Sequence, residues 1–282
     1  GLRFGTHLDL NAQHTMAAAY TQGHHATRLK AHAWRTAEKC AAYLLPHIKP
    51  GMSILDVGCG PGSITVDFAQ LVGPTGKTVG IEISEEPLAM AREMAQARGL
   101  ENATFQVGDI HKLDFPDDTF DIVHVHQVLI HVGDPVHALQ ELRRVTKKGG
   151  IVAAREGDFG LMAWYPQSAD IEVWNEYNIM TISAAGGDPY AGRKLHHWAH
   201  LAGFERSAIS VTVGSYLYHS AEDRQYIGPA TAARLEVAAK SPSMAGTPME
   251  EKLQKGAKAL REWVEMEDAW HTVTNGQIIC TK

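Results

Sequence analysis

Short apolar runs alternate with longer segments of helical periodicity along the first 155 residues. The runs are rich in β-branched residues and predict five strands, at 52–57, 77–83, 103–107, 120–126 and 151–155. Before and between them, apolar residues recur at spacings of three and four, which predicts helices at 26–45, 63–72, 86–98 and 134–145. Asp134 suits the N-cap of the last of these helices and Pro135 its first turn, and Gly99 suits the end of the helix at 86–98.

This alternation of strands and helices predicts βαβ units, and therefore a mainly parallel sheet. Right-handed crossovers between parallel strands place helices on both faces of such a sheet. The expected fold class is therefore α/β, with an open Rossmann-like sheet formed by the residues up to about 155.

The remaining residues show a less regular pattern. We predict helices at 170–185 and 191–202, a sixth strand at 203–213 and a final strand at 276–281. A helix-rich stretch at 220–270, interrupted near Ser241-Pro242, separates the last two strands and is expected to serve as a lid or a dimer element. Residues 1–25 are expected to form an arm or lid, and residues 26–282 a single domain that carries this insertion.

Composition narrows the class of protein. Apolar residues make up 44% and charged residues 21% of the chain, as in ordinary soluble proteins. The net charge of −6 argues against a nucleic-acid partner, which normally needs a basic face. We find neither an apolar stretch of membrane-spanning length nor a secretory signal, and we expect a cytoplasmic protein. The separated cysteines Cys40, Cys59 and Cys280 indicate neither disulfides nor structural zinc, and no clustered ligand motif indicates another metal.

A glycine-rich loop directly follows the first predicted strand and directly precedes a helix. Gly58, Gly60 and Gly62 permit backbone angles denied to other residues and let a ligand approach the main chain. In an open parallel sheet, ligands bind at the carboxyl ends of the strands. The loop therefore predicts a nucleotide-like ligand.

Acidic residues follow at the next two strand ends. Glu82 can accept hydrogen bonds from a ribose diol, with Ile83 beside it. Gly108-Asp109-Ile110 follows the third strand, where Asp109 can accept from an adenine amino group and Ile110 can pack on the ring.

Asp56, just before the glycine loop, decides between two kinds of ligand. A carboxylate there repels the pyrophosphate of a dinucleotide and suits a cation, such as the ammonium and sulfonium of S-adenosylmethionine. The alternative is that Asp56 only braces the loop, and both roles can coexist.

The segment Leu55-Asp56-Val57-Gly58-Cys59-Gly60-Pro61-Gly62 resembles the first motif of class I S-adenosylmethionine-dependent methyltransferases, of the ubiquinone/menaquinone-biosynthesis type. Glu82 and Gly108-Asp109 resemble the second and third motifs, and 115–121, 142–145 and 148–150 resemble the segments around strands four and five. The resemblance is specific over 26–160. It implies a seven-stranded sheet of order 3-2-1-4-5-7-6 with the last strand antiparallel. It also implies S-adenosylmethionine as cofactor and S-adenosylhomocysteine as product.

Histidines follow the fourth predicted strand, whose end faces both cofactor and acceptor in this family. His131 is the leading candidate for a catalytic base, or it braces the loop; His126 is a further candidate, and His124 is interpreted as a core residue. Gln127 is expected to contact the cofactor. The Asn/Asp-Pro-Pro-aromatic motif of exocyclic-amine methyltransferases is absent from this position, which favours a small-molecule acceptor.

Further candidates flank this edge. Glu156 is a candidate catalytic residue, and both Glu156 and Asp158 could orient a substrate. The alternative is an internal network of these carboxylates with Arg155. Trp164 and Tyr165 could wall an apolar pocket or simply pack, and Arg193 could meet an acidic substrate group or cap a turn. The resemblance also implies that Tyr20, His25 and Arg35 fold over the cofactor. The alternative is that they form a polar stripe facing the solvent.

The sequence thus predicts methyl transfer from S-adenosylmethionine to O, N or C of a small metabolite, by in-line displacement. A cofactor-binding, cyclase-like enzyme that does not methylate is one alternative, and a macromolecule methyltransferase is a less favoured one. The insertion makes a homodimer plausible.

Overall fold

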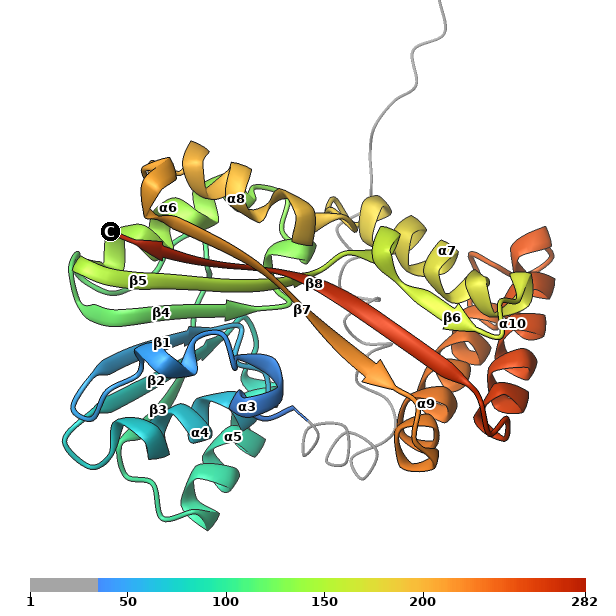
Figure 1. Ribbon diagram of the computed structural model, residues 1–282, viewed down its shortest axis with the longest axis horizontal. Helices are drawn as coiled ribbons and strands as arrows, with labels where there is room; N and C mark the ends of the chain where they lie inside the picture. The colour runs from blue at the N-terminus through green and yellow to red at the C-terminus, as the bar shows by residue number, and fades with distance from the viewer. Residues whose placement is uncertain (1–34) are drawn as a thin grey trace, which may run out of the picture. The chain divides into compact units, whose positions relative to one another are not determined.

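A computed structural model describes residues 35–282, and an eight-stranded sheet forms the centre of these residues (Figure 1). The strands run along the order β3-β2-β1-β4-β5-β8, with β7 on the far side of β8. Their bounds are β1 (Ser53–Val57), β2 (Lys77–Glu82), β3 (Ala103–Val107), β4 (Phe120–His126), β5 (Thr146–Gly157), β6 (Ala163–Tyr165), β7 (Ile209–Tyr218) and β8 (Trp270–Thr281).

The predicted strand order is confirmed, with β7 and β8 as the expected strands six and seven. Strands β1 to β5 pair in parallel, and β8 is antiparallel to both β5 and β7. Strand β6 was not predicted. It pairs with the first residues of β8. Because it has only three residues, it is too short to show the alternating pattern that predicts a strand.

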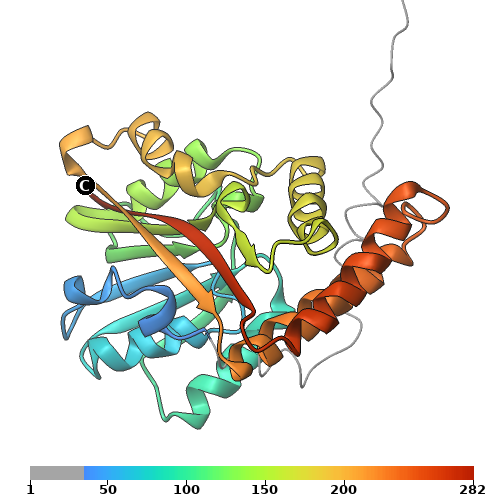
Figure 2. The ribbon, with the colours of Figure 1, turned by 45° about the vertical axis from the view of Figure 1, so that its right-hand side comes forward.

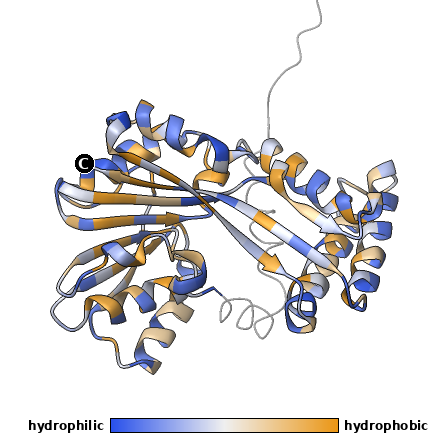
Figure 3. Cartoon of the chain, in the orientation of Figure 1, coloured by the Kyte–Doolittle hydropathy of each residue, from blue (hydrophilic) through white to orange (hydrophobic). Residues whose placement is uncertain are grey.

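Helices cover both faces of the sheet, as expected, because alternate strand residues point to opposite sides. Ile54 and Ile122 pack with α4 on one face, and Leu55 and Val123 pack with α6 and α8 on the other. Apolar residues concentrate in β4 and β5 (Figure 3). The bounds are α4 (Ser63–Val72), α5 (Glu85–Ala97), α6 (Pro135–Val145), α7 (Ala169–Ala184) and α8 (Ala191–Leu201).

The helix predicted at 26–45 is wrong in its described part. Helix α3 (Ala37–Cys40) has four residues and is followed by a turn and the 3-10 helix η1 (Leu45–His47). The guanidinium of Arg155 explains the break, because its Nη1 donates to the carbonyls of Lys39 and Cys40 at 2.9 and 3.0 Å. These carbonyls would otherwise accept from the next helical turn.

The sixth strand begins later than predicted. Gly203 has a φ of 97° and ends α8, and the 3-10 helix η4 (Arg206–Ala208) precedes β7. Strand β7 then continues to Tyr218 because it pairs with β8 along its whole length. Strands β5 and β8 are also longer than predicted for the same reason: each gains residues that pair with a distant strand.

A second core lies at the outer end of the β7–β8 hairpin (Figure 2). Helices α9 (Ala221–Ala239) and α10 (Pro248–Val264) connect the two strands and pack against α7. This is the predicted 220–270 insertion, with its interruption near Ser241-Pro242; its role as lid or dimer element stays a prediction. Among residues 35–282, no helix combines the length and apolar character needed to cross a membrane.

Candidate active site

The carboxyl ends of β1 to β5 lie next to one another at one edge of the sheet. Val57 is in register with Ile81 of β2 and Val125 of β4, and His126 with Arg155 of β5. The backbone N–H of Gln127 donates to the carbonyl of Arg155 at 3.0 Å. The loops that carry most candidate residues therefore converge at this edge, where ligands bind in open α/β sheets.

The three loop glycines have left-handed φ angles of 71°, 53° and 78°, but only one faces open space. A Cβ on Gly58 would clash with Cγ2 of Val128, and a Cβ on Gly62 would lie 2.7 Å from the Cβ of Ala91. A Cβ on Gly60 would meet no atom within 4 Å. Gly58 and Gly62 thus serve close packing, while Gly60 presents bare backbone to a ligand.

Asp56 is buried beneath this loop, and protein groups engage both of its carboxylate oxygens. Oδ1 lies 2.7 Å from Nδ1 of His124, and Oδ2 accepts from the hydroxyl of Thr65 at 2.6 Å. This geometry supports the bracing interpretation of Asp56. Direct contact between Asp56 and the cofactor stays a prediction.

Glu82 and Ile83 lie at the end of β2, where the adenosine of the cofactor is expected. Oε2 of Glu82 accepts the backbone N–H of Ile83 at 2.5 Å, and burial raises the pKa of this carboxyl, although the N–H groups of Ile83 and Gly60 oppose the shift. The Ile83 side chain is 68% exposed, which is unusual for isoleucine and offers an apolar surface to a flat ring. Ile110, in contrast, is buried in the core.

Asp109 is exposed beyond β3. Its Oδ1 accepts the backbone N–H of His111 at 2.9 Å, which lowers the pKa of Asp109 and keeps its carboxylate ionised as an acceptor. Gly108 donates to the carbonyl of Glu82 at 2.9 Å, so these two strand ends are joined. The groups at this edge fit an adenosyl group. Glu82 can accept from a diol and Asp109 from an amine, Ile83 offers an apolar surface, and Gly60 offers bare backbone.

Gln127 adopts a left-handed φ of 58°, an uncommon conformation for a residue other than glycine. Its Nε2 donates to Oδ1 of Asn275 at 2.6 Å, and a Cβ on Gly157 would lie 3.3 Å from its Oε1. The sequence analysis missed Asn275, which comes from the last strand. No local pattern signals a contact between residues 148 positions apart.

His126 is buried at the end of β4. Its Nε2 lies 3.3 Å from the hydroxyl of Tyr216, and its Nδ1 has no hydrogen-bond partner among residues 35–282. Burial lowers the pKa of His126 well below its usual value, and the charges of Arg35, His124 and Arg155 lower it further. The imidazole is therefore neutral at physiological pH.

Glu156 is fully buried and organises the turn after β4. Oε1 accepts the N–H groups of Val128 and Leu129, each at 3.0 Å, and Oε2 accepts that of Ile130 at 3.2 Å. Burial raises the pKa of Glu156 to about 7, although these three hydrogen bonds oppose the shift. The geometry supports a positioning role for Glu156.

His131 stands at the end of this turn and is exposed. Its pKa is lowered, first by partial desolvation and second by the positive charge of Arg234 on α9. A charge on the insertion thus acts on the candidate base.

The residues after β5 form mainly internal contacts. Asp158 is buried and accepts from Nη2 of Arg193 at 2.6 Å, so these two candidate substrate contacts pair with each other. Trp164 is 7% exposed and stacks on His271, with ring centroids 3.4 Å apart, which supports its packing interpretation; Tyr165 is 58% exposed. Arg35 is exposed, and the remaining candidates, Tyr20 and His25, lie outside the described residues.

Comparison with known proteins identifies relatives along most of the chain. The family described as Methyltransferase domain matches residues 48–205. An uncharacterised methyltransferase of Schizosaccharomyces pombe is 35% identical over 269 residues, covering 93% of this chain and 96% of the relative. A protein of Aspergillus luteorubrus named probable methyltransferase ltbC is 33% identical, covering 93% and 97%. Demethylmenaquinone methyltransferase of Bacillus cytotoxicus is 41% identical over a shorter stretch, 39% of this chain and 46% of the relative.

Solved structures share the fold at lower identity. Phosphoethanolamine N-methyltransferase 2 of Haemonchus contortus, in complex with phosphomonomethylethanolamine and S-adenosylhomocysteine, has a TM-score of 0.53 at 18% identity, covering 86% of this chain and 52% of that chain. The YcgJ protein of Bacillus subtilis has a TM-score of 0.51 at 18% identity, covering 86% and 97%. At these identities the likeness shows the fold alone.

Proposed function

Since the chain belongs to the methyltransferase domain family, it is an S-adenosylmethionine-dependent methyltransferase, and we propose that its acceptor is a small molecule. The turn after β4 carries this proposal. It lacks the Asn/Asp-Pro-Pro-aromatic motif of exocyclic-amine methyltransferases, and Glu156 holds it so that His131 stands exposed at its end. The net charge of −6 also gives a polyanion little electrostatic attraction.

The adenosyl group of the cofactor lies over the ends of β1 to β3 in this proposal. Glu82 accepts hydrogen bonds from the ribose diol, Ile83 packs on the adenine ring and Asp109 accepts from its amino group. The bare backbone at Gly60 allows the close approach. When bound, S-adenosylmethionine supplies an electrophilic methyl group on a sulfonium, and the enzyme aligns the acceptor for in-line attack.

His131 is the proposed base. Its lowered pKa keeps the imidazole neutral near pH 7, so it can accept the proton of a hydroxyl nucleophile, or the proton that an ammonium group loses to become a nucleophilic amine. Glu156 positions His131 through the backbone of the turn and does not itself face the acceptor.

The test is a turnover assay of the full chain with labelled S-adenosylmethionine and a panel of small hydroxyl, amine and carbon acceptors. Release of S-adenosylhomocysteine with label in the small molecule supports the proposal. His131→Asn should lower kcat at pH 7 and leave cofactor affinity unchanged, whereas the control His197→Asn, an exposed residue of α8, should change neither. Acceptor conversion without S-adenosylhomocysteine release, or label appearing only in protein or RNA, would overturn the proposal in favour of a cyclase-like or macromolecular reaction.

A further inference from the structure

We propose that Arg234, on the insertion helix α9, binds an anionic group of the acceptor, a carboxylate or a phosphate ester, next to His131. This inference rests on the proposed small-molecule methyltransferase function and adds a substrate class to it.

The guanidinium of Arg234 is exposed and fixed in place by an aromatic ring. Its central carbon lies 4.8 Å from the ring centroid of Trp174 on α7. Such cation–π stacking holds the planar guanidinium against the indole and leaves its N–H edge free to donate. The side chain is thus oriented without the use of its hydrogen bonds.

Among residues 35–282 no protein group forms a hydrogen bond or an ion pair with Arg234, unlike the other two arginines of the α9–α10 hairpin. Arg261 forms an ion pair with Glu236 at 2.8 Å, and Arg224 donates to the carbonyls of His219, Val264 and Glu267. The hydrogen-bonding capacity of Arg234 is therefore available to an external oxyanion.

Glu176, the nearest acidic side chain along α7 after Trp174, is engaged elsewhere. Both of its carboxylate oxygens lie 3.2 Å from Nζ of Lys252 on α10. The positive charge of Arg234 is thus not neutralised from this helix, and guanidinium groups recognise carboxylates and phosphates by paired N–H donors.

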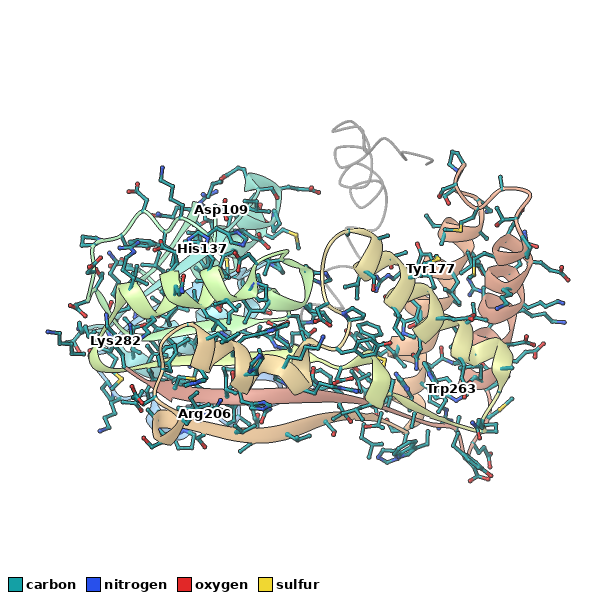
Figure 4. All side chains as sticks on the ribbon, turned by 90° about the horizontal axis from the view of Figure 1, so that it is seen from above. Asp109, His137, Tyr177, Arg206, Trp263 and Lys282 are labelled. Atoms are coloured by element: carbon teal, nitrogen blue, oxygen red, sulfur yellow. The ribbon has the colours of Figure 1, made fainter. Side chains whose placement is uncertain are left out.

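Helix α7 runs from Trp174, which Arg234 contacts, toward the turn that carries His131. Trp174 and Tyr177 are three positions apart and share one side of this helix, and Figure 4 shows Tyr177 on α7 between the sheet and the insertion. The end of α7 packs on the turn after β4: a Cβ on Gly187 would lie 3.1 Å from Cα of His131, and the N–H of Asp188 donates to the carbonyl of Ile130 at 2.9 Å.

Electrostatics agree with this placement. The charge of Arg234 lowers the pKa of the His131 imidazole and partly offsets the increase that burial causes in the pKa of Tyr177. Both effects show that the charge of Arg234 acts on the His131 and Tyr177 side chains. An acceptor bound beside these side chains would direct its anionic end to Arg234 and its nucleophile to His131.

The test measures binding of simple probes to the full chain saturated with S-adenosylhomocysteine. Benzoate and phenyl phosphate carry the two anionic groups, and benzamide is a neutral shape control. We expect at least one of the anions to bind wild type, benzamide to bind more weakly, and Arg234→Gln to lower anion affinity about tenfold or more. Arg206→Gln removes an exposed arginine of η4 far from this site and should change nothing (Figure 4).

Equal anion affinity of wild type and Arg234→Gln, or no binding of either anion, would overturn the inference. An unchanged urea midpoint for Arg234→Gln excludes misfolding as the cause of lost binding, and Arg234→Lys should restore part of the affinity. Turnover of the acceptor panel is an independent readout. If turnover fails while benzoate binding still depends on Arg234, the proposed function is wrong and the anion site stands; if anionic and neutral acceptors have equal KM in wild type and Arg234→Gln, only the anion site is wrong.

Discussion

Oδ1 of Asp56 lies 2.7 Å from Nδ1 of His124, and this contact ties β1 to β4 directly beneath the glycine loop. Both residues are buried, and the second oxygen of Asp56 accepts from Thr65. The acidic residue that marks the family's first motif is therefore also a structural junction of the sheet.

Asp56→Ala should lower the free energy of unfolding by about 3 kcal/mol, because it leaves buried His124 and Thr65 groups without partners. Cofactor affinity should fall as the glycine loop loosens. Thr65→Val, which removes only one hydrogen bond, should cost about 1 kcal/mol. Urea unfolding and calorimetry with S-adenosylhomocysteine measure both effects, and an Asp56→Ala variant as stable as Thr65→Val would contradict the junction role.

Gly60→Ala should weaken cofactor binding about tenfold or more while costing only about 1 kcal/mol of stability, because its Cβ points into the open space of the ligand. Gly99→Ala is the control: Gly99 has a φ of 66° and equally open surroundings, but it lies just past the end of α5. It should have a similar stability cost and unchanged cofactor affinity.

Gly58→Ala should behave differently from Gly60→Ala, since its Cβ would clash with Val128. We expect a stability loss of about 3 kcal/mol or more, from strain and displacement of the β4 turn. A Gly58→Ala protein with wild-type stability and reduced cofactor affinity would show that the packing role assigned to Gly58 is wrong.

Glu156→Ala should lower kcat strongly and cost about 3 kcal/mol, because three buried N–H groups lose their acceptor. Glu156→Gln keeps one oxygen that can accept the N–H groups of Val128 and Leu129. It should therefore retain a higher kcat and a higher free energy of unfolding than Glu156→Ala. Steady-state kinetics and urea unfolding distinguish positioning from direct catalysis. If both variants are as stable as wild type and both lose kcat to the same extent, Glu156 takes part in catalysis directly.

His271 makes the fold acid-sensitive. Burial lowers its pKa to about 4, below the value of 6.5 for a free imidazole, so the unfolded chain takes up the proton first as the pH falls. Its contribution to stability is therefore complete above pH 6.5 and is lost as the pH falls from 6.5 toward 4. His271→Phe keeps an aromatic ring between Trp164 and Tyr218 and removes this titration.

Between pH 7.5 and 5, wild type should lose about 2 kcal/mol relative to His271→Phe. Urea unfolding at the two pH values measures the difference, and His197→Phe, at an exposed position of α8, is the control. A pH-independent difference between wild type and His271→Phe would show that His271 titrates alike in the folded and unfolded chain.

The sequence predicted the elements whose signals are local. Helix α4 has the predicted bounds because Gly62 and Gly73 frame a clear apolar period. The helix at 26–45 failed because Arg155, more than 110 positions away, takes carbonyls that the helix needs. Local propensity carries no information about such a competitor.

The candidate site shows the same division. The loops proposed to bind the cofactor could be located from the sequence because each lies at the end of a predicted strand, as Gly60 and Glu82 do. Contacts between distant segments could not be predicted, such as those of Asn275 with Gln127 and of Arg234 with Trp174. An exposed arginine in a helical segment looks like any solvated charge until the neighbouring helix is placed against it.

The outer half of the β7–β8 hairpin has a mechanical consequence. The insertion is carried by two hydrogen-bonded strands rather than by flexible linkers, and β8 contributes both His271 to the insertion's core and Asn275 to the cofactor edge. Strand β8 therefore links the insertion, through continuous paired backbone, to the residue that holds Gln127.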